Sequence, residues 1–194
     1  MANEGKDIFI LGGPNGAGKT TAAEVLLPQK LRIDSFLNAD EIARNISPGD
    51  VEAAAFAAGR QMIEQMRGLV RDGRSFAFET TCSGKSYIRL LKECKEVGWR
   101  ISLIYLWVPS PEYSIARVAR RVSQGGHNIP EDVIRRRYLA GLWNMRHLYL
   151  PLVYDATIYD NRDRDLRLVA RKAPGFPLKV VDEEIWAGIE ELTP

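Results

Sequence analysis

The chain has 194 residues, of which 45% are hydrophobic and 27% charged, and its formal net charge at pH 7 is +2. A chain of this length forms one domain with a single core by default, and the composition is ordinary for a soluble globular protein. No stretch approaches the roughly 20 apolar residues that cross a bilayer, which excludes a membrane span. The small net charge gives no argument by itself for nucleic acid as a partner.

The first residues and the cysteines of the chain bear on its cellular compartment. Residues 1–7 are polar and lack the apolar core and cleavage site of a signal peptide. Cys82 and Cys94 lie too far apart for a Cys-x-x-Cys motif and have no clustered histidines beside them, so neither a disulfide framework nor a zinc site is indicated. We therefore expect a cytoplasmic protein whose two thiols are packed or idle.

Five apolar segments have the pattern of buried strands. The first is nearly continuous in apolar residues and ends in glycines, which is typical of a strand buried on both faces of a parallel sheet. The expected strands cover residues 7–11, 35–38, 75–78, 99–108 and 156–159.

Helical patterns alternate with these strands. Asp50 is expected to cap a long helix that Gly73 ends, and Ser110 with Pro111 marks the start of another. The expected helices cover residues 20–26 (stopping before Pro28), 50–73, 87–97, 111–122, 130–148 and 183–192. The alternation predicts an α/β fold, a three-layer αβα sandwich with a parallel sheet, formed by a single domain over 1–194 with a helical lid at about 111–148.

Residues 13–20 match the P-loop pattern G-x-x-x-x-G-K-[ST] between a predicted strand and a predicted helix. Glycines let successive backbone N–H groups point at one anion, and the positive end of the helix adds attraction, so the main chain binds the β-phosphate of ATP. Lys19 is expected to reach the β- and γ-phosphates, and the Thr20 hydroxyl to ligate Mg²⁺. The predicted nucleotide-binding residues are Gly13, Pro14, Asn15, Gly16, Ala17, Gly18, Lys19, Thr20 and Thr21.

Two carboxylates follow predicted strands, at the sheet edge where ligands of such folds bind. Asp40 comes just after the second strand and is a candidate base for a substrate hydroxyl; the alternative is that it only caps the next turn of helix. Glu79 ends the third strand and is a candidate for holding Mg²⁺ or positioning substrate; the alternative is a strand-terminal cap.

Arginines are concentrated in the predicted lid, around a glycine-rich loop at 124–128 that contains His127. Planar guanidinium groups suit the spread charge of a transferring phosphate, although a solvated basic face is the alternative for each arginine taken alone. His127 is a candidate for a role in the lid loop only. The seven arginines are Arg117, Arg120, Arg121, Arg135, Arg136, Arg137 and Arg146.

After the fifth strand, Asn161 and Arg162 occupy a loop that can touch the adenine base. Arg162 is a candidate for stacking on that base and Asn161 for hydrogen bonding to it. An ordinary turn rich in Asn and Asp is the alternative.

Five segments together resemble the zeta-toxin-like small kinases over roughly residues 7–165. They are Gly-Gly-Pro-Asn-Gly-Ala-Gly-Lys-Thr-Thr at 12–21, Asn-Ala-Asp-Glu-Ile-Ala at 38–43, Phe-Glu-Thr-Thr at 78–81, Gly-Gly-His at 125–127 with Arg-Arg-Arg-Tyr at 135–138, and Asp-Asn at 160–161. The resemblance implies an ATP- and Mg²⁺-dependent kinase that phosphorylates a UDP-activated amino sugar, and it raises an antitoxin protein as a partner. It implies a phosphate-binding Lys19, a base at Asp40, a substrate motif of Glu79 and Thr81, and lid arginines at Arg121 and one of 135–137, which we take to be Arg136.

The leading hypothesis from the sequence is therefore a small-molecule kinase. A second hypothesis, motivated by the arginine-rich segment, is a nucleic-acid end-processing enzyme or nucleic-acid-dependent ATPase, whose affinity for nucleic acid would fall steeply with salt. A third is a nucleotide-binding module without catalysis, which would bind ATP but turn over no acceptor.

Overall fold

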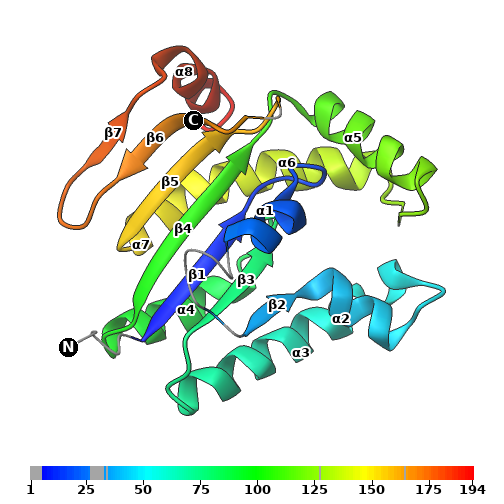
Figure 1. Ribbon diagram of the computed structural model, residues 1–194, viewed down its shortest axis with the longest axis horizontal. Helices are drawn as coiled ribbons and strands as arrows, with labels where there is room; N and C mark the ends of the chain where they lie inside the picture. The colour runs from blue at the N-terminus through cyan, green and yellow to red at the C-terminus, as the bar shows by residue number, and fades with distance from the viewer. Residues whose placement is uncertain (1–5, 27–32, 34, 127, 164) are drawn as a thin grey trace.

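The computed structural model of the protein describes residues 6–26, 33, 35–126, 128–163 and 165–194. Its strands are β1 (Asp7–Gly12), β2 (Phe36–Asn38), β3 (Phe76–Thr80), β4 (Arg100–Trp107), β5 (Asp155–Asp160), β6 (Arg167–Lys172) and β7 (Leu178–Val180). They form one sheet in the order β2-β3-β1-β4-β5-β6-β7 (Figure 1).

The helices form layers on the two faces of this sheet. They are α1 (Lys19–Leu26), α2 (Ala39–Ile46), α3 (Val51–Arg71), α4 (Ser86–Glu96), α5 (Pro111–Ser123), α6 (Glu131–Asn144), a π-helical segment η2 (Met145–Tyr149), α7 (Leu150–Leu152) and α8 (Glu183–Glu191). Figure 1 shows α1 in front of the sheet and α4, α6 and α7 behind it, as the predicted α/β sandwich requires. Within the described ranges, no helix has the combination of length and apolar character that crossing a bilayer requires.

The five strands predicted from the sequence form the parallel part of the sheet. β1 pairs in parallel with β3 and β4, β2 with β3, and β4 with β5. Their apolar residues are buried on both faces because helices cover both faces. The largest fully buried side chains of these strands include Ile8, Ile10, Phe76, Phe78, Ile101, Leu103 and Tyr105.

The sheet extends beyond the predicted parallel strands. β6 pairs antiparallel with β5, and β7 antiparallel with β6. The sequence of this region does not predict strands, because only Val169 and Ala170 of β6 are fully buried and charged residues stand close on both sides. Two adjacent buried residues among charged ones do not show the alternation of apolar and polar residues that predicts a strand.

Two helices also differ from expectation. α2 begins directly after β2, where Asn38 caps it by accepting hydrogen bonds from the backbone N–H groups of Asp40 and Glu41. The alternative that Asp40 is the cap is therefore wrong, since Asp40 lies inside the first turn. The predicted helix over 130–148 is α6 followed by the π-helical segment η2. The predictions for His127 and for the end of the first helix before Pro28 lie outside the described residues.

Candidate active site

The glycine-rich loop turns tightly between β1 and α1. Gly13 and Gly18 have φ values of +146° and +82°, in the region that favours glycine. A Cβ atom on Gly13 would lie 2.5 Å from the Leu106 carbonyl oxygen, and one on Gly18 would lie 2.9 Å from the Asn161 amide nitrogen. The loop therefore depends on glycine both for its backbone conformation and for its close packing, and it leads straight into the N-terminus of α1 at Lys19.

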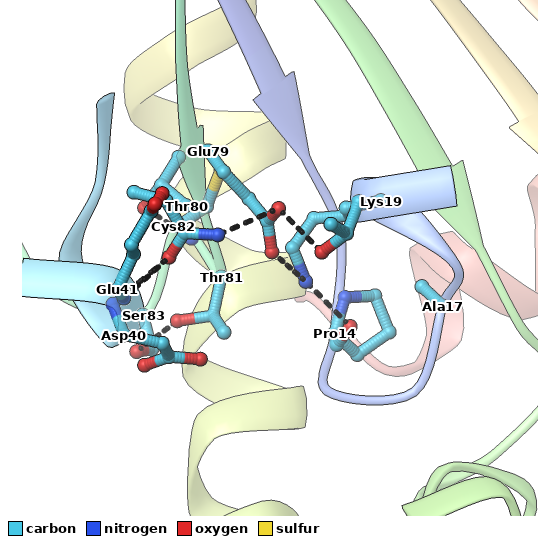
Figure 2. A network of polar contacts seen from close by, with 12 residues as sticks. Pro14, Ala17, Lys19, Asp40, Glu41, Glu79, Thr80, Thr81, Cys82 and Ser83 are labelled. Atoms are coloured by element: carbon cyan, nitrogen blue, oxygen red, sulfur yellow. Dashed lines mark hydrogen bonds and ion pairs between the residues drawn. The ribbon is translucent and has the colours of Figure 1, made fainter. Parts of the chain in front are cut away.

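Glu79 gathers three polar side chains from neighbouring elements, and we call Lys19, Thr20, Asn38 and Glu79 the Glu79 cluster (Figure 2). Lys19 Nζ lies 3.7 Å from Glu79 Oε1 and donates a hydrogen bond of 2.9 Å to the Pro14 carbonyl oxygen. The Thr20 hydroxyl and the Asn38 amide donate to Glu79 Oε2 at 3.0 and 3.2 Å. Parallel pairing of β2 and β3 aligns Asn38 with Glu79, so the register of the sheet builds this cluster.

Two oxygens of the cluster fit a Mg²⁺ site. Thr20 Oγ1 and Glu79 Oε2 are hard donors that lie 3.0 Å apart at the start of α1. Among the described residues, no group of three or more His, Cys, Asp or Glu side chains gathers to bind a metal. Mg²⁺ suits such a sparse protein site, because it keeps several waters and takes its other ligands from nucleotide phosphates.

Asp40 and Thr81 lie on another side of the Glu79 cluster (Figure 2). The Asp40 side chain is exposed at the first turn of α2, and the Thr81 hydroxyl lies 2.8 Å from the Ser83 hydroxyl. Burial and, secondarily, the charge of Asp40 raise the pKa of Tyr87 to about 12, so the neutral phenol persists at physiological pH. These groups present hydroxyls and one carboxylate beside the phosphate-binding loop.

One cavity of about 930 Å³ connects the glycine loop, the Glu79 cluster, Asp40 and the helices α5 and α6. It extends past α2 to small residues of α3 and to the start of α4. A volume of this size holds a drug-sized ligand or more. Its lining includes Asn15, Gly16, Gly18, Lys19, Thr20, Thr21, Asp40, Ala55, Gly59, Glu79, Thr81, Ser83, Ser86 and Tyr87.

Four of the seven lid-region arginines line this cavity, namely Arg117, Arg120, Arg121 and Arg137. Arg117 donates hydrogen bonds of 3.3 Å to the carbonyl oxygens of Gly16 and Arg162, and its guanidinium lies over the Tyr113 ring. The predicted residue Arg136 is exposed and is not part of the lining, whereas its neighbour Arg137 is.

The remaining two arginines hold other parts of the fold together. Arg135 forms an ion pair with Glu112 between α6 and α5, and this hydrogen bond is the main cause that lowers the pKa of Glu112 to about 2. Arg146 pairs with Glu190 of α8 and donates to the Thr193 carbonyl oxygen.

The loop after β5 contacts the phosphate-binding loop through the side-chain amide of Asn161. Asn161 Nδ2 donates to the Ala17 carbonyl oxygen at 2.6 Å, and Asn161 also lines the cavity. Arg162 is paired with Asp160 at 2.6 Å and lies over the Trp107 ring, and it does not line the cavity. The structure thus brings Asn161 to the site and directs the Arg162 side chain elsewhere.

Three contributors to the site were not identified from the sequence: Asn38, Ser83 and Tyr87. Asn38 carried a usable signal, because Asn is strongly preferred at a helix N-cap. Ser83 and Tyr87 carried none, since their place depends on how α4 meets the end of β3. Cys82 and Cys94 are buried free thiols, as expected.

Comparison with known proteins identifies the family. A family described as an AAA domain matches residues 8–140, which include the glycine loop, Asp40, Glu79 and Arg137. An uncharacterized protein of Haemophilus influenzae is 33% identical over 135 residues, which cover 70% of this chain and 94% of that protein.

Two solved structures share the fold. The AvrRxo1-ORF1:-ORF2 complex with ATP matches with a TM-score of 0.72 and 19% identity over 94% of this chain, which spans 63% of the length of that relative. The PezAT chromosomal toxin-antitoxin system of Streptococcus pneumoniae matches with a TM-score of 0.64 and 18% identity over 98% of this chain and 86% of that one. The chain therefore belongs to the AAA domain family, and its fold is that of the zeta-toxin-like P-loop kinases.

Proposed function

We propose that this protein is an ATP-dependent kinase that transfers the γ-phosphate of ATP to a hydroxyl group of a small molecule. The observation that carries the proposal is a cavity in which the glycine loop and Lys19 adjoin an exposed carboxylate, Asp40, and the hydroxyl-bearing residues after β3. A phosphate donor and a hydroxyl acceptor can meet in such a cavity. Positioning of this kind, with charge stabilisation, is the main catalytic need of phosphoryl transfer.

On the donor side, the backbone N–H groups of the glycine loop and the Lys19 ammonium would hold the phosphates. Lys19 is 6% exposed, so its charge acts with little screening by water. Thr20 and Glu79 would hold Mg²⁺ in its usual complex with ATP. When bound, that ion would neutralise part of the charge on the phosphate oxygens.

On the acceptor side, Asp40 would accept the proton of the attacking hydroxyl. Its carboxylate is exposed and lines the cavity. Thr81 would hydrogen-bond the acceptor. Arg121 and Arg137 would contact the transferred phosphate, with Arg137 in the place first assigned to Arg136, because Arg137 lines the cavity.

The identity of the acceptor and of any partner is a finer proposal. The resemblance to zeta toxins favours a UDP-activated amino sugar as acceptor. Because the PezAT relative is a toxin-antitoxin system, we further propose an antitoxin protein as a partner. We propose Mg²⁺ as the metal because Thr20 and Glu79 bring two hard oxygen donors together. A role on nucleic acid is less favoured, since four of the seven arginines line the cavity.

The test is phosphate transfer from labelled ATP and Mg²⁺ to a panel of nucleotide sugars, nucleosides, small alcohols and oligonucleotides. Replacing Asp40→Asn should lower the turnover number for the accepted compound by roughly 10²–10⁴-fold, as loss of a general base does. Affinity for ATP should stay within about twofold, because Asp40 is assigned to the acceptor. Rates and affinities come from product formation and from titration of a fluorescent ATP analogue.

Glu41→Gln is the matched control, since Glu41 is an exposed carboxylate in the same turn of α2. It should keep the parental rate. An Asp40→Asn protein that transfers phosphate at the parental rate would exclude Asp40 as the base. A parent that phosphorylates nothing on the panel, while it binds ATP, would favour the non-catalytic alternative.

A further inference from the structure

The turn that follows Glu79 is conformationally strained. We call residues 81–84 the acceptor turn, because Thr81, Ser83 and Gly84 line the cavity. Among the described residues, Cys82 is the one non-glycine residue with a positive φ, +58°. Residues held in this region cluster at functional sites and persist only where the surrounding structure fixes them. Something must therefore hold the acceptor turn in place.

Part of the restraint comes from the turn itself. The Cys82 backbone N–H donates a hydrogen bond of 3.0 Å to the Thr80 hydroxyl, and the Thr81 and Ser83 hydroxyls lie 2.8 Å apart. These local bonds leave the carbonyl groups of the turn without partners inside the turn. Helix α6 supplies a hydrogen-bond donor to the carbonyl oxygens of Cys82 and Ser83.

The C-terminal part of α6 packs directly against the acceptor turn. Asn144 is 3% exposed, and its amide nitrogen donates to the carbonyl oxygens of Cys82 and Ser83 at 2.8 and 3.1 Å. A Cβ atom on Gly141 would collide with the Thr81 carbonyl oxygen, so the backbones touch there. One side chain thus bridges two successive bends of the turn, and a glycine allows the helix to come close enough.

The same helix also carries a lid arginine into the cavity. Arg137, Gly141 and Asn144 are spaced by four and three residues, which places them on one face of α6. Arg137 lines the cavity one turn before Gly141 contacts the acceptor turn. Straight after Asn144 the helix widens into the π-helical segment η2, a form that is frequent at functional sites.

We propose that Asn144 is a positioning residue for phosphate transfer. By bridging the Cys82 and Ser83 carbonyl groups, it holds the Thr81 and Ser83 hydroxyls toward the cavity. It thereby fixes their position relative to Arg137. The acceptor turn and the phosphate-contacting arginine are then set by one rigid helix face. The part of the inference that concerns transfer rests on the proposed kinase function, and the part that concerns the turn does not.

The test replaces Asn144→Ala and uses Leu139→Ala, a half-exposed position on the same helix, as the matched control. Without the amide, backbone amides of residues 80–85 should exchange with deuterium at least about tenfold faster, because the turn opens locally. Peptides from the glycine loop and the affinity for a fluorescent ATP analogue should be unchanged. In transfer assays, kcat/KM for the accepted compound should fall by roughly 10- to 100-fold while KM for ATP stays within about twofold.

Each outcome decides a separate question. Unchanged exchange at 80–85 in the Asn144→Ala protein would overturn the inference, and so would an equal rise in KM for ATP and for the acceptor. If Asn144→Ala does not fold, Asn144→Ser keeps a polar side chain but is too short to bridge the Cys82 and Ser83 carbonyl oxygens, and it must raise exchange in the same peptide. If the parent phosphorylates no acceptor, the proposed function fails, but the exchange experiment still supports or overturns the role of Asn144 because it needs no acceptor.

Discussion

Glu79 illustrates how one side chain can serve two states of the site. Lys19 is buried beside it, 3.7 Å from Glu79 Oε1, and donates a hydrogen bond to the Pro14 carbonyl oxygen. Under the proposed function, the Glu79 carboxylate would compete with the phosphates of ATP for Lys19, and Mg²⁺ held by Glu79 would lessen that competition.

This competition predicts an unusual response to Glu79→Gln. In EDTA the variant should bind a fluorescent ATP analogue more tightly than the parent, because the anion that opposes phosphate is gone. We expect Mg²⁺ to raise the affinity of the parent for the ATP analogue. In Glu79→Gln this rise should be smaller by on the order of tenfold, since hydrogen bonds to charged groups contribute about 1.5–3 kcal/mol. Titrations with and without Mg²⁺ measure both effects.

Glu24→Gln is a suitable control, because Glu24 is an exposed carboxylate on α1. It removes the same charge from α1 one turn after Thr20, outside the Glu79 cluster. If Glu79→Gln keeps the full gain from Mg²⁺, Glu79 does not help to hold the metal.

At the scale of single residues, the sequence indicates which kinds of side chain form the site, but it does not indicate which side of a helix faces the cavity. Lys19 and Thr20 lie where the P-loop pattern puts them, because that pattern fixes the backbone as well as the side chains. Arg136 and Arg137 are adjacent in sequence but differ by about 100° around a helix. Which of them lines the cavity depends on how α6 rotates against the sheet, and tertiary contacts such as that of Gly141 set this rotation.

At the scale of elements, the link between β2 and α2 determines where Asp40 lies. Asn38 ends the strand, caps the helix and donates to Glu79, so one side chain joins the proposed base to the carboxylate proposed to hold the metal. Two elements meet there with no intervening loop. The position of Asp40 is therefore tied to the sheet.

Replacing Asn38→Ala should destabilise the protein by about 1 kcal/mol, the usual cost of a lost N-cap, and more if the Glu79 contact contributes. Asn38→Ser keeps a capping oxygen and should recover most of that loss. Urea denaturation followed by circular dichroism gives both values. Equal stability of the parent and Asn38→Ala would mean that the cap contributes nothing to folding.

The elements that escaped prediction share a physical cause. The strands β1, β3 and β4 are buried on both faces and read as apolar runs, which sequence patterns detect. β6 and β7 lie beyond β5 toward one border of the sheet and expose charged residues, so their place in the sheet depends on pairing with β5. α2 escaped because it is short: eight residues make about two turns, and only Ile42 and Ala43 are buried.

At the scale of the whole molecule, binding of ATP with Mg²⁺ should raise the melting temperature. At roughly 100 times its Kd a ligand adds about 2.7 kcal/mol, which corresponds to roughly 5–10 °C for a chain of this size. Lys19→Met should abolish most of the shift, since Lys19 is the main side-chain contact assigned to the phosphates. Differential scanning fluorimetry measures this.

Lys92→Met provides the control, because Lys92 is exposed on α4. It should show the parental shift. If Lys19→Met and the parent respond equally, nucleotide is stabilising the protein from another site.

The order of the strands also bears on how these molecules behave in a crowded solution. The two strands at the borders of the sheet, β2 and β7, have only three residues each. An open border offers unpaired N–H and C=O groups that can recruit a neighbouring chain, and a short border gives such a neighbour little to pair with. The long apolar strands that would aggregate most readily are enclosed in the middle, so the same strand order that places the site also discourages fibril-like self-association.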